Sequence, residues 1–492
     1  MPIGPNDLAT DVRTILDQAA VVAHGTDLET AVEATRQRLD EPLRVAIAGR
    51  VKAGKSTLLN ALVGERLAAT DAGECTRIVT WYRNAIGYRV VADLRDGSRR
   101  DLMFNRRDGA LDIDLAGLAF GDVDRLDVGC PSAKLEDLTL IDTPGLASAT
   151  EGTSERTERA LLDGGEGPGD ADAVLYLMRH LHRSDVGFLE AFMDRSVAHA
   201  SPINAIVVLS RADEIGAARP DALDSAAAVA ERYAGDARVR ELASGVVPVA
   251  GLIAETGATL RETQVGWLRE IAALPEVSRD RLLLSVERFR DPDLNPLSEE
   301  IREELLERLG LFGLRVSVGL LADGTARTAT DLSAALLERS GIRDLQRALA
   351  ERYGTRAQAL KARSALAALR VVAEALDRRG VDGASEIVVA VDRLESSSQE
   401  LALLRLLHLV LTGAVDLSPD ERGEVDRLCG ATPAGTRVGL QPDASPAAVR
   451  DASLQAIERW RARAASPFSD RRTVEAAEIV SRAYEGIYAA AV

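Results

Sequence analysis

The sequence predicts an α/β domain with a mostly parallel sheet and helices on both faces, together with an α-helical bundle formed from both chain ends. Short apolar runs alternate with Gly- and Asp-rich turns from residue 43 to about 250, which is the pattern of strands joined by helices. Apolar residues recur at helical spacing over residues 7–40. Beyond residue 345 the β-runs stop, and segments rich in Ala, Leu, Arg and Glu keep a helical period.

In chain order, the expected elements divide into three parts. Residues 1–42 form a helical segment that we expect to join the bundle. Residues 43–355 form the α/β domain, with strands expected at "LRVAIA", "RIVTWYR", "LTLI", "DAVLYLM", "NAIVVLS" and "VVPVAG". The stretch 255–345 is apolar, but its Leu and Val spacing and Arg315 favour helices packed on the domain over a membrane segment. Residues 356–492 form a helical neck or short stalk.

Composition and charge exclude several classes of protein. The 492 residues carry a net charge of −17, which argues against nucleic acid or an anionic membrane as a partner of the whole surface, because both favour a basic footprint. The three cysteines, Cys75, Cys130 and Cys429, lack metal-ligand spacing and indicate reduced thiols of a cytoplasmic protein. No apolar stretch has the length and continuity expected of a membrane-spanning helix.

A glycine-bounded loop follows the first expected strand. Only four of the 60 cationic side chains are lysines, and two of them, Lys52 and Lys55, lie in this loop. The loop satisfies G-x-x-x-x-G-K-[ST] between a strand and a helix, the context in which this pattern binds nucleotide phosphates. Lys55 is expected to reach the β- and γ-phosphates as a compact charge, and Ser56 to bind Mg²⁺. The expected phosphate-binding residues are Gly49, Arg50, Val51, Lys52, Ala53, Gly54, Lys55, Ser56 and Thr57.

Two further motifs complete the expected catalytic end of the site. "DTPG" follows the strand "LTLI", where Asp142 would hold a Mg²⁺-bound water and the N–H of Gly145 would meet the γ-phosphate. Upstream, "DAGECTRIVTWYR" offers Thr76 as the switch residue that completes Mg²⁺ coordination when a triphosphate is bound. Together these residues predict hydrolysis of a nucleoside triphosphate, with Mg²⁺ as cofactor.

The base is expected to be guanine. "NAIVVLS" leads into Ser210-Arg211-Ala212-Asp213, a variant of [NT]-K-x-D in which Asp213 would accept two hydrogen bonds from the guanine edge. The apolar stem of Arg211 would cover the base, and the backbone N–H of Ala250 in "VVPVAG" would meet the guanine carbonyl. Each of these two segments alone is also compatible with an ordinary surface loop. Their order on successive strands supports GTP and GDP as the ligands.

The chain resembles the dynamin family, because "GRVKAGKSTLLNAL", "CTRIVTWYR", "DTPG" and "SRAD" match its four GTP-binding motifs in order. More narrowly, it is similar to the bacterial dynamin-like proteins of actinobacteria, including their isoniazid-inducible members. The resemblance implies hydrolysis of GTP to GDP coupled to assembly and membrane remodelling, in a response to isoniazid or other cell-envelope stress. It also implies a peripheral location at the inner face of the cytoplasmic membrane. The implied partner is a sister dynamin-like GTPase or a second copy bound through the GTPase domain.

One departure from the family concerns the phosphate loop. Dynamins carry a glutamine followed by a serine there, which helps to bind a charge-compensating monovalent cation, whereas this chain has Val51 and Lys52. We expect the Lys52 ammonium to supply that charge in cis, near the oxygen that bridges the β- and γ-phosphates. The alternative is a solvated loop lysine.

The helical tail leads to a prediction about lipid contact. If its helices run out from and back to the GTPase domain in turn, the turns "DRRGVDG" and "RARAASPFSDRR" share the distal tip. An exposed aromatic among arginines is suited to weak contact with anionic head groups, at about 1 kcal/mol per arginine near the surface. The alternative is that these arginines complement helix ends. The candidate lipid-contact residues are Arg378, Arg379, Arg461, Arg463, Phe468, Arg471 and Arg472.

The competing function is that of a regulatory GTP-binding protein without membrane activity, for instance a ribosome-assembly GTPase. Such proteins normally carry a basic RNA-binding module, and the sequence has no dense Lys/Arg patch with interleaved aromatics. No nucleic-acid partner is therefore expected. Sedimentation with liposomes, with and without GTP, separates the two functions.

Overall fold

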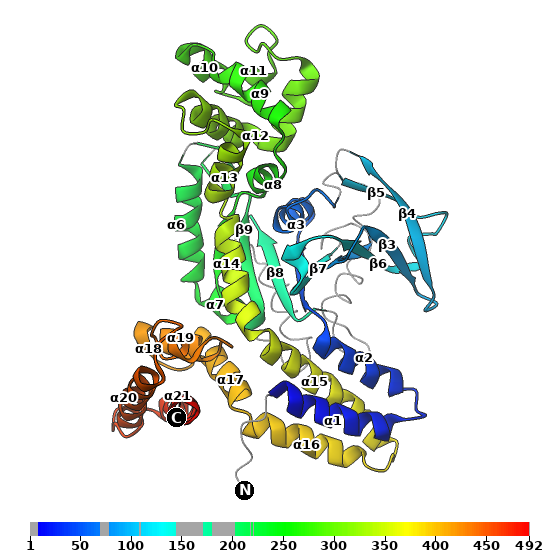
Figure 1. The fold of residues 1–492 in the computed structure, drawn as a ribbon, viewed down its shortest axis with the longest axis vertical. Helices are drawn as coiled ribbons and strands as arrows, with labels where there is room; N and C mark the ends of the chain where they lie inside the picture. The colour runs from blue at the N-terminus through cyan, green and yellow to red at the C-terminus, as the bar shows by residue number, and fades with distance from the viewer. Residues whose placement is uncertain are drawn as a thin grey trace.

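The structure of the protein is a computed structural model that describes residues 8–68, 78–107, 110–143, 171–179, 202–216, 218–219 and 221–491. At its centre lies a ten-stranded sheet with the strand order β10-β9-β8-β1-β7-β2-β6-β3-β4-β5 (Figure 1). The strands are β1 (Leu43–Gly49), β2 (Val79–Asn84), β3 (Arg89–Leu94), β4 (Arg99–Arg107), β5 (Ala110–Asp114), β6 (Val123–Cys130), β7 (Leu138–Asp142), β8 (Ala173–Met178), β9 (Ala205–Ser210) and β10 (Val246–Val249).

The half of the sheet from β10 to β7 is parallel throughout. β1 lies between β7 and β8, with Ile47 opposite Asp142 and Gly49 opposite Leu177, and β9 joins β8 to β10. In the other half, β2 and β6 run parallel, whereas the pairs β7–β2, β6–β3, β3–β4 and β4–β5 are antiparallel. The predicted mostly parallel sheet is confirmed. The carboxyl ends of β1, β7, β8 and β9 meet at one edge, where sheets of this kind bind ligands.

Helices cover both faces of the parallel half. One face packs against α3 (Lys55–Val63) and α14 (Ile342–Arg352) in a hydrophobic core that continues into the tail. The opposite face packs around Trp81 and against the end of α7 (Ala237–Leu242), and α6 (Ala222–Ala234) lies beside β10. Because both faces are covered, every residue of β8 and β9 is buried.

Most of the segment 255–345 belongs to a helical module at the carboxyl ends of β9 and β10, at the top of Figure 1. Its helices pack around a hydrophobic core of their own, which reaches the sheet at Leu209 and Ala250. Among the residues that the structure describes, no helix is long and apolar enough to cross a membrane. The helices of the module are α8 (Gly251–Thr259), α9 (Glu262–Ala272), α10 (Glu276–Leu282), α11 (Val286–Arg290), α12 (Glu299–Ala322) and α13 (Ala329–Arg339).

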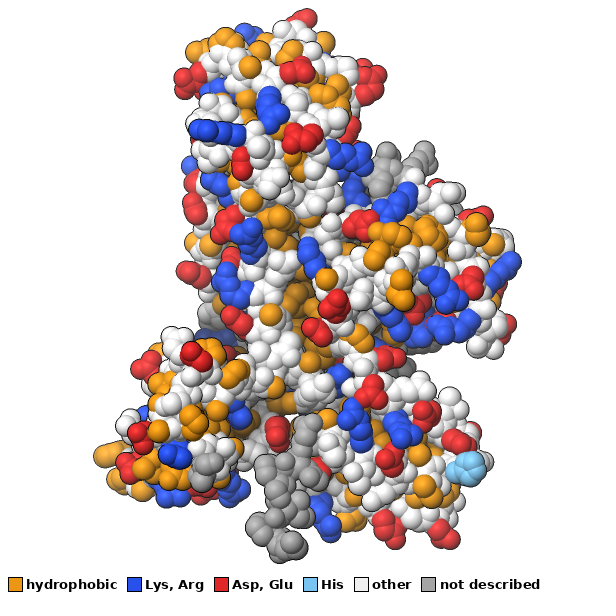
Figure 2. Space-filling view, viewed as in Figure 1, with side chains coloured by type: hydrophobic (Ala, Val, Ile, Leu, Met, Phe, Trp, Pro, Cys, Tyr) orange, Lys and Arg blue, Asp and Glu red, His pale blue; other side chains and the backbone are white. Residues whose placement is uncertain are grey.

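The remaining helices form two groups. α1 (Leu8–Ala23) and α2 (Glu29–Asp40) pack against α15 (Ala357–Arg378) and α16 (Ala384–Ser397), so the predicted bundle from both chain ends is confirmed. The helices after residue 398 pack mainly with one another, and the two groups appear as separate lobes below the sheet (Figure 1; Figure 2). The second lobe comprises α17 (Gln399–Leu411), α18 (Pro419–Leu428), α19 (Ala434–Arg437), α20 (Pro446–Ala464) and α21 (Arg471–Ala490).

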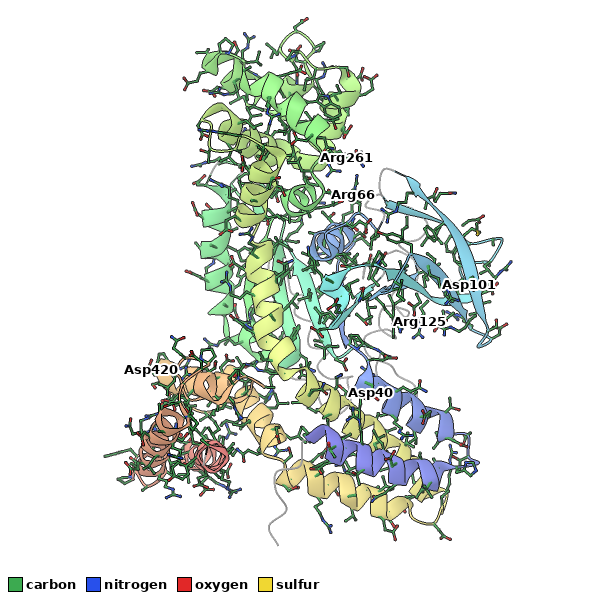
Figure 3. All side chains as sticks on the ribbon, in the orientation of Figure 1. Asp40, Arg66, Asp101, Arg125, Arg261 and Asp420 are labelled. Carbon is green, nitrogen blue, oxygen red and sulfur yellow. The ribbon has the colours of Figure 1, made fainter. Side chains whose placement is uncertain are left out.

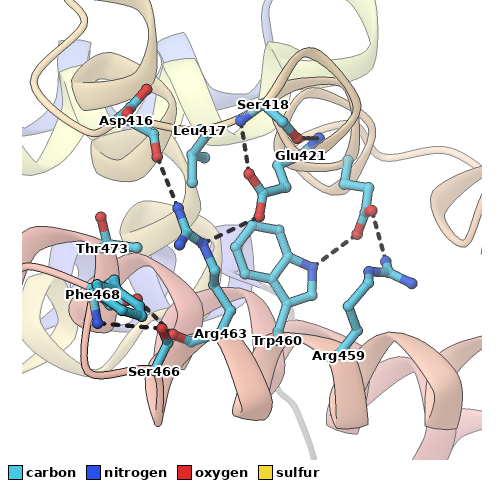
Figure 4. Close-up of polar contacts among 12 residues, drawn as sticks. Asp416, Leu417, Ser418, Glu421, Arg459, Trp460, Arg463, Ser466, Phe468 and Thr473 are labelled. Carbon is cyan, nitrogen blue, oxygen red and sulfur yellow. Dashed lines mark hydrogen bonds and ion pairs between the residues drawn. The ribbon is translucent and has the colours of Figure 1, made fainter.

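The predicted shared tip of the tail is wrong. The turn at Arg378 and Arg379 belongs to the first lobe, where Arg379 forms a 2.5 Å ion pair with Asp27 between α1 and α2. The α20–α21 turn belongs to the second lobe, where Arg463 donates to the carbonyl oxygen of Asp416 at 3.4 Å (Figure 4). The chain leaves the first lobe at the α16–α17 junction instead of returning along it, which separates the two turns. The residues that stay together are Arg461, Arg463, Phe468, Arg471 and Arg472.

Candidate nucleotide-binding site

The loop between β1 and α3 has the backbone geometry that phosphate binding requires. Gly49 has a φ of +149°, and a Cβ atom there would lie 2.6 Å from the carbonyl oxygen of Leu177 on β8. Gly54, with a φ of +93°, precedes α3, and no side chain caps that helix. Both motif glycines are therefore required by geometry. The uncapped N–H groups and the dipole of α3 face the loop, as an anion site needs.

Lys55 is partly buried beneath this loop. Its Nζ donates to the carbonyl oxygens of Gly49 at 3.2 Å and Arg50 at 3.3 Å. Burial lowers the pKa of Lys55, and the charge of Asp142 opposes that effect. A desolvated ammonium held by neutral carbonyl oxygens gains a much stronger partner when an anionic phosphate enters the loop.

Ser56 and Asp142 lie next to each other where α3 begins and β7 ends. The Ser56 hydroxyl donates to the Asp142 carboxylate at 3.2 Å. Burial raises the pKa of Asp142 above its ordinary value of 3.8, whereas Lys55 and the hydrogen bonds from Ser56 and Thr143 lower it. A hydroxyl and a carboxylate are ligands that Mg²⁺ takes alongside phosphate oxygens and water, so this pair fits the ion. Bound Mg²⁺ would favour the ionised carboxylate.

A cavity of about 160 Å³ opens beside the loop, between α3, β9 and α8. Asp213 lies in its wall and is only 8% exposed, and burial raises the pKa of this carboxyl above 3.8. Ser210 also lines the cavity, and its hydroxyl donates to the carbonyl oxygen of Met178 on β8 at 3.2 Å. A buried carboxylate in a small cavity next to the phosphate loop is suited to accept the two N–H donors of a guanine edge.

Arg211 connects the cavity to the phosphate loop. Its guanidinium donates to the carbonyl oxygen of Lys52 at 3.0 Å and pairs at 2.6 Å with Glu214, which also pairs with Arg179. Lys52 has a φ of +62°, a left-handed conformation that is costly for a residue other than glycine, so the hydrogen bond from Arg211 helps to hold it. No pattern in the sequence predicts the part that Glu214 and Arg179 play here, because their charges alone carry no signal of this contact.

The predicted role of Ala250 is wrong. Its N–H donates to the carbonyl oxygen of Ser340 at 2.9 Å, so that donor is already paired within the protein. The cavity is lined instead by Gly251 and Leu252, the first two residues of α8, which has no side-chain cap. The N–H groups of an uncapped helix start are suited to meet the guanine carbonyl. The sequence signal for this exchange is Gly251, which follows Ala250 after the end of β10 at Val249.

Two predicted catalytic residues, Thr76 and Gly145, lie outside the described residues. Lys52 is exposed on the loop, and its catalytic role stays a prediction. The structure brings the other predicted site residues together along one edge of the sheet. These are Lys55, Ser56 and Asp142 at the phosphate end, and Arg211 and Asp213 at the base end.

Similarity to known proteins covers most of the chain. The profile of a family described as "50S ribosome-binding GTPase" matches residues 44–210. Over 456 residues, the chain is 41% identical to isoniazid-induced protein IniC of Mycobacterium tuberculosis, a match that covers 92% of this chain and 91% of that protein. The bacterial dynamin-like protein of Nostoc punctiforme is 31% identical over 164 residues, 31% of this chain and 22% of that protein. The chain belongs to the bacterial dynamin-like family.

Two more similarities complete the comparison of this dynamin-like GTPase with known proteins. Isoniazid-induced protein IniA of Mycobacterium tuberculosis is 31% identical over 170 residues, 32% of this chain and 27% of IniA. A solved structure described as an oligomerised bacterial dynamin pair covers 97% of this chain and 90% of its own, at 14% identity with a TM-score of 0.34. Membership of the family confirms the predicted GTPase fold and the predicted hydrolysis of GTP.

Proposed function

We propose that this dynamin-like GTPase couples hydrolysis of Mg²⁺-bound GTP to remodelling or maintenance of the cytoplasmic membrane, as a peripheral protein at its inner face. The observation that carries the nucleotide part is the arrangement at one sheet edge. The Ser56–Asp142 pair lies on the β7 side of β1, and the Asp213 cavity lies on the β9 side, where Ala53, Gly54 and Thr57 line it. That spacing suits a ligand with an anionic end that needs a metal and a base that offers two donors.

Each residue has a proposed role in turnover. Lys55 and the N–H groups of α3 neutralise the β- and γ-phosphates, and Asp213 holds the base. Ser56, Thr76 and Asp142 would hold Mg²⁺, which would supply further neutralisation of the phosphate oxygens. The N–H of Gly145 and the ammonium of Lys52 meet the charge that develops as the bond to the γ-phosphate breaks. The other residues proposed to contact the nucleotide are Gly49, Arg50, Val51, Ala53, Gly54, Thr57 and Arg211.

The α20–α21 hairpin is the proposed contact with anionic lipid. Phe468 at its turn is 94% exposed, and hydrophobic and basic side chains mix over this lobe in Figure 2. Arginines of the hairpin pair with carboxylates of the same lobe, Arg463 among them (Figure 4). These pairs offset part of the positive charge, so we expect binding that is weak, salt-sensitive and dependent on Phe468. The pairs are Arg461–Glu485, Arg463–Glu421 and Arg471–Glu475.

A sister dynamin-like GTPase is the proposed partner. The similarity to IniA supports a related second protein, and a homodimer through the GTPase domain is the other arrangement that the resemblance implies. The similarity to isoniazid-induced proteins supports a role in the response to isoniazid or cell-envelope stress. The alternative of a regulatory GTPase draws on the ribosome-binding profile, which matches 44–210 alone, whereas the similarity to IniC extends through the helical lobes.

Sedimentation with phosphatidylglycerol liposomes tests the membrane part of the proposal. We expect the wild type to sediment at low salt, and Phe468→Ala to bind roughly tenfold more weakly, because burying a phenylalanine contributes about 1.5–3 kcal/mol. The matched control is Ile86→Ala, which removes a fully exposed apolar side chain from the β2–β3 turn of the GTPase domain. Equal sedimentation of Phe468→Ala and wild type would contradict a lipid role for this hairpin.

A further inference from the structure

A buried polar network lies one helical turn behind the nucleotide site. α3 begins at the phosphate loop and α8 begins at the Asp213 cavity, and these two helices pack against each other. Asn60 follows Ser56 by one turn on α3, and Glu255 follows Gly251 by one turn on α8. Both side chains are buried, with Asn60 at 0% and Glu255 at 4% exposure. The network therefore joins the two helices whose first turns face the ligand.

Asn60 ties α3 to the chain that follows it and to α8. Its Oδ1 accepts from the N–H groups of Leu67 and Ala68, both at 2.9 Å. Its Nδ2 donates to the carbonyl oxygen of Ala68 at 3.0 Å and to the Glu255 carboxylate at 3.4 Å. One amide thus uses both of its ends within the protein.

The network continues from Glu255 to Arg66 and, along α8, to α12. The Glu255 carboxylate forms a 2.8 Å ion pair with Arg66, which lies beside the end of α3 in Figure 3. One turn further along α8, Thr259 accepts through its hydroxyl at 2.5 Å from the buried Arg308 of α12, and Thr256 donates to the Arg308 carbonyl oxygen. Breaking one partner of such a buried set leaves charges or donors without water or protein to satisfy them.

We propose that Asn60, Arg66 and Glu255 are positioning residues that set the guanine-facing end of α8 against the phosphate-facing end of α3. This inference rests on the proposed assignment of the Asp213 cavity to guanine. A rigid connection between α3 and α8 lets one nucleotide contact the starts of both helices without reordering the protein, which increases affinity. Weakening this connection reduces nucleotide affinity more than it slows turnover, because Lys55 and Ser56 at the phosphate end are left intact.

The test compares Glu255→Ala and Glu255→Gln with wild type in GDP binding and in GTP turnover. We expect Glu255→Ala to raise the Kd for GDP and the KM for GTP by about tenfold, with kcat changed by less than about twofold. Glu255→Gln keeps the shape and a hydrogen-bonding group toward Asn60, so it should recover part of the affinity. If Glu255→Ala does not fold, the same KM-against-kcat split is measured on Glu255→Gln.

The matched control is Asn295→Ala in the helical module. Asn295 is a buried asparagine whose amide donates to the carbonyl oxygen of Phe289 at 2.8 Å and accepts from the N–H of Leu297 at 3.1 Å, away from the nucleotide site. It should lower Tm and leave GDP affinity unchanged. Wild-type affinity in both Glu255 variants, or an equal loss in Asn295→Ala, would overturn the positioning role. Failure of the wild type to prefer GDP over ADP would instead overturn the proposed guanine site.

Discussion

Replacing Asp213 by Asn removes the charge that the proposed guanine site uses to recognise its base. The carboxylate is 8% exposed, so bulk water does not take the place of the lost acceptor. A hydrogen bond to a charged group contributes about 1.5–3 kcal/mol net, which corresponds to a loss of roughly 10- to 100-fold in GTP affinity. The asparagine amide offers a donor to the C2 oxygen that xanthine carries in place of the guanine amino group. Affinity for xanthosine triphosphate should therefore rise in the same variant.

Competition against a fluorescent GDP analogue at fixed Mg²⁺ measures both affinities. The wild type should prefer GTP over xanthosine triphosphate, and Asp213→Asn should reverse that order. The matched control is Asp221→Asn, because Asp221 is an exposed carboxylate that pairs with Arg219 outside the cavity lining, and its loss should keep the guanine preference. An Asp213→Asn variant that still prefers GTP as strongly as wild type would refute the assignment of this cavity to the base.

Two further predictions follow from the phosphate end of the site. Gly49→Ala should lower the free energy of unfolding in urea by roughly 2–4 kcal/mol, since it adds a clash with a backbone oxygen to an unfavourable φ. Gly97→Ala, with a φ of +84° and open space around it, should cost only about 1 kcal/mol, and equal losses would contradict the clash. Mg²⁺-dependent GDP affinity should fall as pH drops through the pKa of Asp142, raised above 3.8, because the protonated carboxyl binds no metal. The folded state holds the Asp142 proton more tightly than the unfolded state, so in the nucleotide-free protein the contribution of Asp142 to the free energy of unfolding should fall as pH rises from 3.8 through the raised pKa. Calorimetric titration with GDP should show affinity rising with pH over this range, and urea unfolding should show the stability contribution of Asp142 falling.

The sequence predicts those parts of the site that depend on local order along the chain. The strand, the glycines and Lys55 lie within one short stretch, and the adjacent β1 and β7 bring Asp142 to Ser56. Ala250 was misassigned because the use of its N–H depends on Ser340, which is remote in sequence. No local sequence pattern predicts the contact between Ala250 and Ser340.

The helical tail shows the same limit in a different form. Periodicity predicts its helices, but the path between them depends on which faces pack together, and the α16–α17 junction sends the chain into a second lobe. The Asn60–Glu255 hydrogen bond joins residues 195 positions apart, so spacing and motifs do not predict it either. Contacts between distant segments decide these features.

Hydrolysis of GTP and ATP, measured side by side at equal concentration with Mg²⁺, tests the central claim most directly. The account predicts that the wild type hydrolyses GTP and turns over ATP at least about 100-fold more slowly, and that Lys55→Ala abolishes GTP turnover. The matched control is Lys134→Ala, which removes an exposed lysine remote from the phosphate loop in sequence and should keep the wild-type rate. Equal turnover of ATP and GTP, or an active Lys55→Ala variant, would contradict the account.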